Sequence, residues 1–527
     1  MASRTQNARR NIVTSVINKL VIMLTNFVMR TILIWFLGKV YLGLDSLFTS
    51  ILQILSLSEL GISSAMVYSM YKPLAKGDTV TICALLKLYR TVYRVIAVAM
   101  IVIGVAIIPF LHFIVKEELP EGLNLYWLYL INLGNTVLSY LLFSYRSSLF
   151  TADQKYSINN NIYSIFKIGT TLIQIIAIFL LKDFKSVAYY LYTLALPLTT
   201  IIKNLVLYYL SNKMYPQYKC EGTVPKETID GIKKRVAGMF LHKVSFVFRN
   251  SLDSIVISGF LGLEILGQYN SYYFIINAIS GVMILVSNSV TASVGNSIVV
   301  ESKEKNYADF NKLQLLYMWL TCWITVGFVG CLQPFIKKWV GEGMMFNDVI
   351  MVMFCVYFFS IHFVRVCHIY RDAAGLWWHD RYRPVVETVT NLSLNVLLVY
   401  LAQKLKLHGY EVSGVMLSTI FCIVFIEGTW GTRILFKHYF TEEKQSKYMM
   451  RLLWSWILTA IAGAICYVIC MYIPLTGIPA IIVYGIIATV IANIIYALGS
   501  SMLPEFKPAV RFALKLVGMN KFIKKSK

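Results

Sequence analysis

The residues of this sequence that could do chemistry are charged side chains set inside long apolar blocks. In the first block, Lys19, Asn26 and Arg30 follow i, i+7, i+11 spacing, which places them within about 40° of one another on a helix. Arg30 has no acidic residue one turn away in its own block. Ionisable groups at membrane depth usually face a bundle interior or a wet cavity, so we predict that this stripe lines a cationic substrate-binding cavity. For Lys19, near the end of the block, snorkelling to the membrane surface is the alternative.

A later block, residues 237–260, carries a similar stripe. His242, Arg249 and Asp253 repeat the same spacing, and Lys243 and Asn250 lie beside them. We predict that Arg249, Lys243 and Asn250 line the same cavity from a second helix. The alternative is that Arg249 and Asp253, one helical turn apart, form an ion pair that only neutralises itself. Snorkelling is again the alternative for Lys243.

Carboxyl groups inside the blocks could couple or gate transport. Glu59 lies in the second block between Ser56 and Ser63, and a carboxylate in an apolar setting can bind a proton or cation reversibly. We predict coupling or gating roles for Glu59 and Asp253. For Glu59, a structural contact between helices is the alternative.

One more polar group lies near the end of the block at 347–370. Arg365, His368 and Asp372 share one helical face there. Since they lie close to the predicted inner mouth, we interpret them as a structural network at that mouth and not as the substrate site.

Motifs of common catalytic machinery are missing from the sequence. It contains no GxxxxGK[ST] phosphate loop, no HExxH and no GxSxG. We therefore expect a protein that is not an enzyme, with no catalytic residues, no metal site and no cofactor. Coupling to protons or sodium ions stays open.

The elements that must position these residues are membrane helices. Of the 527 residues, 57% are hydrophobic and only 14% are charged, against about 25% charged in soluble domains, and the mean hydropathy is +0.65. A span needs roughly 20 apolar residues. We predict an all-α, polytopic membrane protein with about fourteen spans at 12–37, 44–70, 91–115, 124–150, 158–181, 186–210, 237–260, 270–299, 308–331, 347–370, 383–402, 411–434, 449–473 and 476–500.

The basic residues indicate the orientation of these spans. With the N-terminus inside, 8 of the 49 Lys and Arg fall in external segments, 38 are counted with the cytoplasmic segments and the cytoplasmic sides of the spans, and 3 are assigned to span interiors, namely Arg30, Lys203 and Arg249. This bias is what the positive-inside rule requires, so both termini are predicted to be cytoplasmic, with the first span retained. The net charge of +23 is thus mainly a topology signal, and no nucleic-acid partner is expected because the charges form no single patch.

An internal repeat divides the chain. Gly38 matches Gly262 and Gly43 matches Gly267, each at an offset of 224, and YRSSLFTADQKY from Tyr145 resembles YRDAAGLWWHDRYRP from Tyr370. Because an even number of helices separates the copies, they predict parallel repeats, with two pseudo-symmetric six-helix lobes around a central cavity. The predicted parts are an N-lobe at 1–210, a cytoplasmic linker at 211–236, a C-lobe at 237–440, two extra helices at 441–503 and a basic amphipathic tail at 504–527, which we place on the inner leaflet.

Several segments from both lobes carry a resemblance to a known family. They are YLGLDSLFTSILQILSLSELGISSAMVYSMYKPLAKGD (41–78), DSIVISGFLGLEILGQYNSYY (253–273), TASVGNSIVVESKEKN (291–306), PFIKKWVG (334–341) and RDAAGLWWHDRYRPVVETVTNL (371–392). In these segments the chain resembles the Wzx-like polysaccharide flippases of the multidrug/oligosaccharidyl-lipid/polysaccharide exporter superfamily. It departs from them at Arg249 and Asn250, and at Glu427 in the twelfth predicted span.

The resemblance implies a transporter of the bacterial cytoplasmic membrane. Such flippases move undecaprenyl-pyrophosphate-linked oligosaccharide to the outer leaflet by alternating access, for cell-surface polysaccharide biosynthesis. On this hypothesis Arg30 and Arg249 hold the pyrophosphate, while Lys19 and Lys243 guide it from the inner leaflet. We expect a monomer in the lipid bilayer, with a glycan polymerase and glycosyltransferases as further partners.

Two other functions are alternatives. A cation-coupled multidrug exporter of the same superfamily would need an acidic, aromatic cavity, whereas the predicted cavity is cationic. A membrane glycan polymerase or acyltransferase would need a sizeable external loop or a catalytic His/Asp set, and the predicted external connections are short.

Overall fold

The computed structural model describes residues 4–56, 62–115, 119–153 and 155–516, and within these ranges the chain is helical, with no strand. Ten helices in the described ranges are long and apolar enough to cross a membrane, and one bent pair would make an eleventh. Each predicted span falls on one helix or on successive helices. The predicted all-α, polytopic membrane fold is therefore confirmed.

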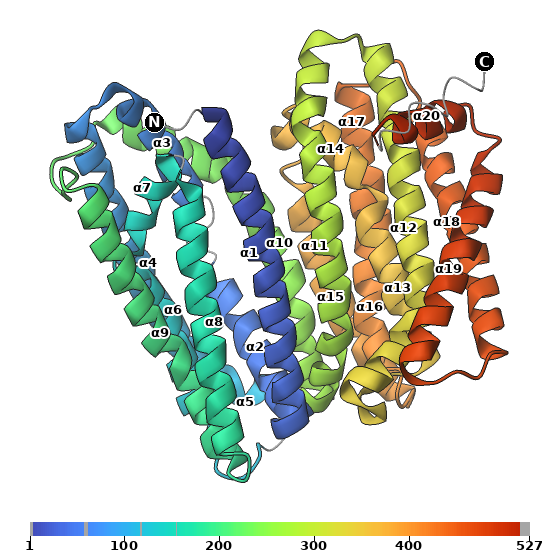
Figure 1. The fold of residues 1–527 in the computed structure, drawn as a ribbon, viewed down its shortest axis with the longest axis horizontal. Helices are drawn as coiled ribbons and strands as arrows, with labels where there is room; N and C mark the ends of the chain where they lie inside the picture. Colours follow the sequence, from blue (N-terminus) through green and yellow to red (C-terminus); the bar gives the residue numbers. More distant parts are fainter. Residues whose placement is uncertain (1–3, 57–61, 116–118, 154, 517–527) are drawn as a thin grey trace. The chain divides into compact units, whose positions relative to one another are not determined.

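The chain divides into two compact units, Met1–Gly267 and Gln268–Lys527. The helix α10 begins the predicted C-lobe, but its contacts with α2 and α3 group it with the first unit. The lobe boundaries drawn from the repeat stay a prediction. The first unit contains α1 (Arg4–Ile32), η1 (Leu33–Leu37), α2 (Lys39–Leu55), α3 (Ile62–Lys76), α4 (Thr79–Ile107), η3 (Ile108–Phe110), α5 (Leu111–Ile114), α6 (Leu125–Leu141), η4 (Ser144–Arg146), α7 (Ser147–Ala152), α8 (Tyr156–Leu180), α9 (Lys185–Met214) and α10 (Lys226–Leu261) (Figure 1).

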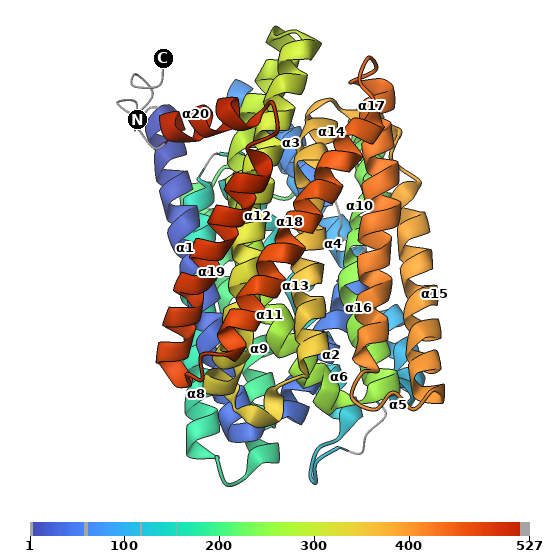
Figure 2. The same cartoon turned by 90° about the vertical axis from the view of Figure 1, so that its right-hand side faces the viewer.

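The second unit holds the rest of the helices. It contains most of α11 (Leu263–Val300), then α12 (Lys303–Val340), η5 (Glu342–Met344), α13 (Asp348–Phe363), α14 (Arg365–Ala373), η6 (Leu376–Trp378), α15 (Arg383–Lys404), α16 (Val412–Phe421), η7 (Cys422–Gly431), α17 (Thr432–His438), α18 (Gln445–Met471), α19 (Gly477–Ser500) and α20 (Phe506–Leu516) (Figure 2).

The helix α19 shows why these sequences form membrane helices. One face is buried and carries small or aromatic residues at every fourth position, namely Ala480, Tyr484, Ala488, Ala492 and Tyr496. This face packs on α12 and α18. The other face exposes a ladder of branched and aliphatic side chains, Ile478, Ile482, Ile486, Val490, Ile494 and Leu498, each at least half exposed. A continuous exposed apolar ladder indicates contact with lipid.

The short helix α20 forms the first part of the predicted amphipathic tail. It packs on α12 and lies across the direction of α18 and α19 (Figure 2). The Phe506 ring stacks on Trp319 with centroids 6.0 Å apart, and Glu505, just before the helix, pairs with Arg451 at 2.8 Å. Lys507 and Arg511 are exposed, which fits a basic helix on an anionic surface. Residues 517–527 lie outside the described part of the chain.

The first pair of repeat-matched glycines has one backbone conformation. Gly38 ends η1 with φ 104° and ψ −178°, and Gly262 ends α10 with φ 98° and ψ 170°. These positive φ values are open to glycine and costly for other residues. In both copies the chain therefore leaves a long helix and begins the next one through the same turn.

The second pair of matched glycines lies where these turns meet inside the first unit. A Cβ on Gly43 would overlap the backbone carbonyl of Leu263, and a Cβ on Gly267 would overlap that of Lys39. Leu263 is the repeat equivalent of Lys39, so the two contacts are reciprocal. The Lys39 ammonium also pairs with Glu264 at 2.7 Å. The repeat detected in the sequence thus corresponds to a place where the starts of α2 and α11 cross and make two equivalent contacts.

The Tyr-Arg echo marks a second break in corresponding helices. α6 and the η4–α7 segment are bent by 47°, and α13 ends at Phe363 just before α14. Tyr145 and Tyr370 are both buried after these breaks, as are the arginines that follow them, Arg146 and Arg371.

Candidate functional site

Four polar side chains from four helices of the first unit form what we call the cationic cluster: Arg30 of α1, Asp45 of α2, Lys167 of α8 and Tyr192 of α9. The Tyr192 hydroxyl donates a hydrogen bond of 3.0 Å to Asp45 Oδ1. Arg30 and Lys167 both interact electrostatically with the Asp45 carboxylate. The cluster thus places two cations around one anion.

The turn after α1 brings two members of the cationic cluster together. Arg30 lies in the last turn of α1, and the chain then passes through η1 and the Gly38 turn into α2, which carries Asp45. α1 packs on α8, and α8 packs on α9. These helix contacts bring Lys167 and Tyr192 to the same interior.

Stacked tyrosines fix the α9 side of the cluster. The Tyr189 and Tyr192 rings stack with centroids 5.6 Å apart, and Tyr41 meets Tyr189 edge-on at 5.1 Å. All three rings are buried. Because these rings pack against one another, the Tyr192 hydroxyl is held toward Asp45.

The charge of the cationic cluster favours an anionic ligand. Arg30, Asp45 and Lys167 are half-buried, and charged groups at membrane depth are costly and are typically kept for function. Two cations and one carboxylate leave one excess positive charge. Arg and Lys donate charge-assisted hydrogen bonds that suit phosphate oxygens.

The other predicted residues of the first blocks lie at different places. Asn26 is half-buried on α1, whereas Lys19 is exposed. Lys19 precedes Arg30 by eleven residues, about 16 Å along a helix, so it lies well away from the cationic cluster. Glu59 falls outside the described residues, and its coupling role stays a prediction.

The predicted stripe of α10 is described only in part. Lys243, Arg249 and Asn250 belong to α10 by their backbone, as does His242, but their side chains lie outside the described part of the structure. Asp253 is described and is buried, with 7% of its surface exposed. The pairing of Arg249 with the cavity therefore stays a prediction.

The second unit contains a buried set of ionic contacts that we call the arginine–carboxylate network: His368, Arg371, Asp372, Asp380, Arg383, Glu387 and Glu427. Its centre is Asp380, which has no exposed surface. Asp380 accepts hydrogen bonds from Arg371 Nη1 at 2.6 Å and from Arg383 Nε at 2.7 Å. One carboxylate thus joins two arginines from different segments.

Arg383 extends the arginine–carboxylate network along its own helix α15 and to η7. Its Nη1 donates to Glu387 Oε2 at 2.9 Å and lies 3.3 Å from Glu427 Oε1. Glu427 in η7 also lies 3.3 Å from His368 Nε2. The network therefore connects α14, α15 and η7 with the segment between them.

Two of the three residues predicted at the inner mouth take part in this network. Asp372 Oδ1 accepts a hydrogen bond from Arg371 at 3.1 Å, and His368 reaches Glu427. Arg365 instead donates from Nε to Ser287 Oγ of α11 at 2.9 Å. These contacts are those of a structural tie between helices.

The sequence reasoning missed the partners of Arg30. Asp45 and Tyr192 lie on other helices, and no spacing rule links them to Arg30. Lys167 lies in the middle of the predicted 158–181 span, so the sequence does carry a signal for it as a charge inside an apolar block. In the described ranges, no group of three or more His, Cys, Asp or Glu side chains is placed to hold a metal ion.

Solved structures identify the fold. An inward-facing multidrug resistance MATE family transporter of the MOP superfamily is 12% identical, with a TM-score of 0.59 over 79% of this chain and 98% of its own. The lipid II flippase MurJ in an inward closed conformation is 14% identical, with a TM-score of 0.60 over 95% of this chain and 99% of its own. This chain therefore shares the fold of these two transporters.

Sequence comparisons add no relative to these structural matches. No protein-family model matches it, and no curated protein matches it significantly. The similarity to MurJ covers both the repeat region and most of the chain that follows it. At these identities the similarity concerns the fold, and the substrate must be argued from the residues of this chain.

Proposed function

We propose that this protein is a flippase that moves undecaprenyl-pyrophosphate-linked oligosaccharide across the bacterial cytoplasmic membrane for cell-surface polysaccharide biosynthesis. The observation that carries the proposal is the cationic cluster of Arg30, Lys167, Asp45 and Tyr192 inside a MOP fold. A pyrophosphate group carries several anionic oxygens, and the excess positive charge of the cluster offers them partners.

Each candidate residue has a role in this proposal. Arg30 and Arg249 hold the pyrophosphate, with Lys167 added as a second cation beside Arg30. Asn26 and Asn250 contribute amide donors, and the exposed Lys19, with Lys243, attracts the lipid head group from the inner leaflet. These roles agree with the half-buried position of Arg30 and the exposed position of Lys19.

Asp45 gives the site a way to release its ligand. A ligand can shift a transporter between two states only if it binds them with different affinity. The Asp45 carboxylate competes with pyrophosphate for Arg30 and Lys167. It therefore lowers the affinity of the cationic cluster for pyrophosphate. Glu59 and Asp253 are the candidates for proton or sodium coupling. We further propose that the protein acts as a monomer with both termini in the cytoplasm, beside the polymerase and glycosyltransferases of its glycan.

A cation-coupled multidrug exporter is the second candidate. The observation that favours it is the similarity to a multidrug resistance MATE family transporter. The excess positive charge of the cluster argues against this function. In the low dielectric of a protein interior, the cluster would repel a cationic drug.

Complementation of a flippase-null strain tests the proposal. Arg30→Ala and Lys167→Ala should abolish surface glycan, and Arg30→Lys should retain part of it because the charge remains while the bidentate geometry is lost. Lys203→Ala is the matched control, since Lys203 is a half-buried span residue that lies over the Tyr163 ring. Normal surface glycan in Arg30→Ala and Lys167→Ala would disprove the site, and altered drug tolerance with normal glycan would favour the exporter.

A further inference from the structure

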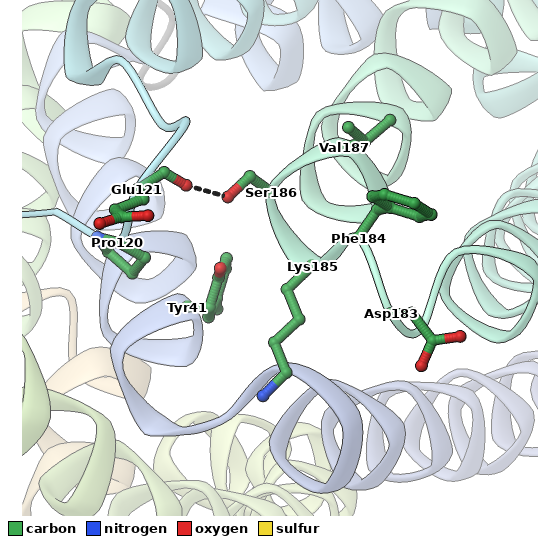
Figure 3. Close-up of a pocket in the computed structure, with 8 residues that line it drawn as sticks. All are labelled: Tyr41, Pro120, Glu121, Asp183, Phe184, Lys185, Ser186 and Val187. Atoms are coloured by element: carbon green, nitrogen blue, oxygen red, sulfur yellow. Dashed lines mark hydrogen bonds between the residues drawn. The ribbon is translucent and has the colours of Figure 1, made fainter.

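A cavity of about 430 Å³ opens at one end of the first unit (Figure 3). Its lining comes from three separate segments: Tyr41 at the start of α2, Pro120 and Glu121 in the connection before α6, and residues 183–187 at the start of α9. With the predicted spans and the N-terminus inside, these segments lie in or next to the external connections 38–43, 116–123 and 182–185. The structure brings them to one place, which agrees with their assignment to one side of the membrane.

The walls of this outer pocket are held together by side-chain contacts. The Ser186 hydroxyl donates to the Glu121 carbonyl at 2.5 Å, as the dashed line in Figure 3 shows. The backbone N–H of Asn124 donates to the Tyr190 hydroxyl at 2.8 Å. Because these bonds tie the connection before α6 to α9, they hold the walls of the pocket in place, which lowers the cost of binding a ligand.

The chemistry of the outer pocket differs from that of the cationic cluster. It offers the carboxylates of Glu121 and Asp183 and the ammonium of Lys185, a net charge of −1. Carboxylates accept hydrogen bonds and an ammonium donates them. The hydroxyl groups of a ligand can therefore donate to Glu121 or Asp183 and accept from Lys185. The net negative charge repels phosphate.

An exposed aromatic face completes the outer pocket. Phe184 is 65% exposed, whereas Tyr41 is only 5% exposed and its ring forms the floor. Figure 3 shows the Tyr41 ring between Glu121 and Lys185. Apolar ring faces combined with a few placed polar groups are typical of small-molecule sites, and this combination suits a ligand with C–H faces and many hydroxyls.

We infer that the outer pocket binds an uncharged sugar residue of the transported oligosaccharide at the outer face. This inference rests on the proposed function and adds a second subsite to it. The pyrophosphate is bound by the cationic cluster, and the glycan end is bound by Phe184, Glu121, Asp183 and Lys185. Such a subsite would select the sugar at the far end of the glycan, since the pocket rejects the phosphate end.

Saturation-transfer difference NMR on the full chain in lipid nanodiscs tests the inference. The probes are N-acetylglucosamine, galactose and, separately, inorganic pyrophosphate followed by ³¹P NMR. We expect saturation transfer to the ring protons of at least one sugar, and a loss of at least tenfold in apparent affinity in Phe184→Ala. Asp183→Asn and Glu121→Gln, at exposed positions where folding is not at risk, should weaken the sugar signal three- to tenfold.

The controls separate this inference from the proposed function. Phe110→Ala removes another exposed phenylalanine that does not line the pocket, and it should leave the sugar signal unchanged. Arg30→Ala should keep sugar binding while losing pyrophosphate binding, and Phe184→Ala should do the reverse. Equal sugar signals in wild type and Phe184→Ala, or the absence of any sugar signal in the wild type, would overturn the outer pocket. Glycan transport that survives Arg30→Ala would overturn the proposed function while leaving the pocket intact.

Discussion

Gly43 lies against the backbone carbonyl of Leu263, and the repeat-equivalent contact places Gly267 against the carbonyl of Lys39. The start of α11, at Leu263, therefore occupies the space that a side chain at Gly43 would need. The start of α2, at Lys39, likewise occupies the space that a side chain at Gly267 would need. Since the four positions obey one offset in sequence, the crossing is a two-fold contact made within one chain. Contacts of this kind, built on small residues, allow close approach of membrane helices.

Alanine at either of these glycines should destabilise the protein. The added methyl group would overlap backbone atoms that cannot rotate away, and forced overpacking costs about 1–3 kcal/mol. We expect a lower melting temperature for Gly43→Ala and Gly267→Ala, measured by thermal unfolding in nanodiscs. Gly169→Ala in α8 is the matched control, because nothing lies within 4 Å of its added Cβ. An unchanged melting temperature in both crossing variants would show that the helices do not meet here.

Removing Asp380 should leave two buried arginines without their shared carboxylate. Breaking a buried ionic contact by deleting one partner costs about 3–5 kcal/mol, so Asp380→Ala should lower the melting temperature strongly or prevent folding. Asp309→Ala is the comparison, since Asp309 pairs with Lys312 on a partly exposed face, where such pairs contribute about 1 kcal/mol or less. Equal effects of the two variants would contradict the structural role of the arginine–carboxylate network.

Neutralising Asp45 should tighten pyrophosphate binding and slow transport. Asp45→Asn keeps the size of the side chain and an acceptor for Tyr192 but removes the anion that competes for Arg30 and Lys167. We expect the Kd for pyrophosphate to fall about three- to tenfold, which corresponds to about 0.6–1.4 kcal/mol, measured by calorimetry. Surface glycan should fall at the same time, because release becomes harder. Weaker pyrophosphate binding in Asp45→Asn would show that the carboxylate supports the ligand instead of competing with it.

Cysteine labelling can test the predicted orientation. Glu121→Cys in the outer pocket should react with a membrane-impermeant maleimide added to intact cells, and Glu443→Cys between α17 and α18 should react only after the cells are opened. The parent chain, with its nine native cysteines, gives the background labelling. The reverse labelling pattern would show that the orientation is opposite to the predicted one and that the outer pocket faces the cytoplasm.

Much of the fold could be predicted from the sequence because hydropathy, charge bias and the repeat act over whole segments. The helices coincide with the predicted spans, and the matched glycines Gly38 and Gly262 share one backbone conformation. Positive φ and close packing leave little choice of residue at such points, so the repeat is visible there even in a hydrophobic chain.

The candidate site could be predicted only in part. Arg30 was identified because a single charge in an apolar block is conspicuous, but the partners that set its chemistry, Asp45 and Tyr192, come from other helices. Of the arginine–carboxylate network, the sequence indicated only His368 and Asp372, grouped with Arg365, because spacing finds neighbours on one helix. Its centre, Asp380, joins Arg371 of α14 to Arg383 of α15, and Arg383 reaches Glu427 of η7, contacts between segments that only the folded chain brings together.

The length of the exposed apolar ladder of α19 can be compared with the thickness of a membrane. From Ile478 to Leu498 the ladder covers 21 residues, about 30 Å along a helix, which equals the hydrocarbon thickness of an ordinary bilayer. Tyr472 lies six residues before the ladder, and Glu505, which pairs with Arg451, lies seven residues after it. The apolar face of α19 therefore matches an ordinary bilayer in length, and a thicker or thinner bilayer would leave a hydrophobic mismatch along this helix.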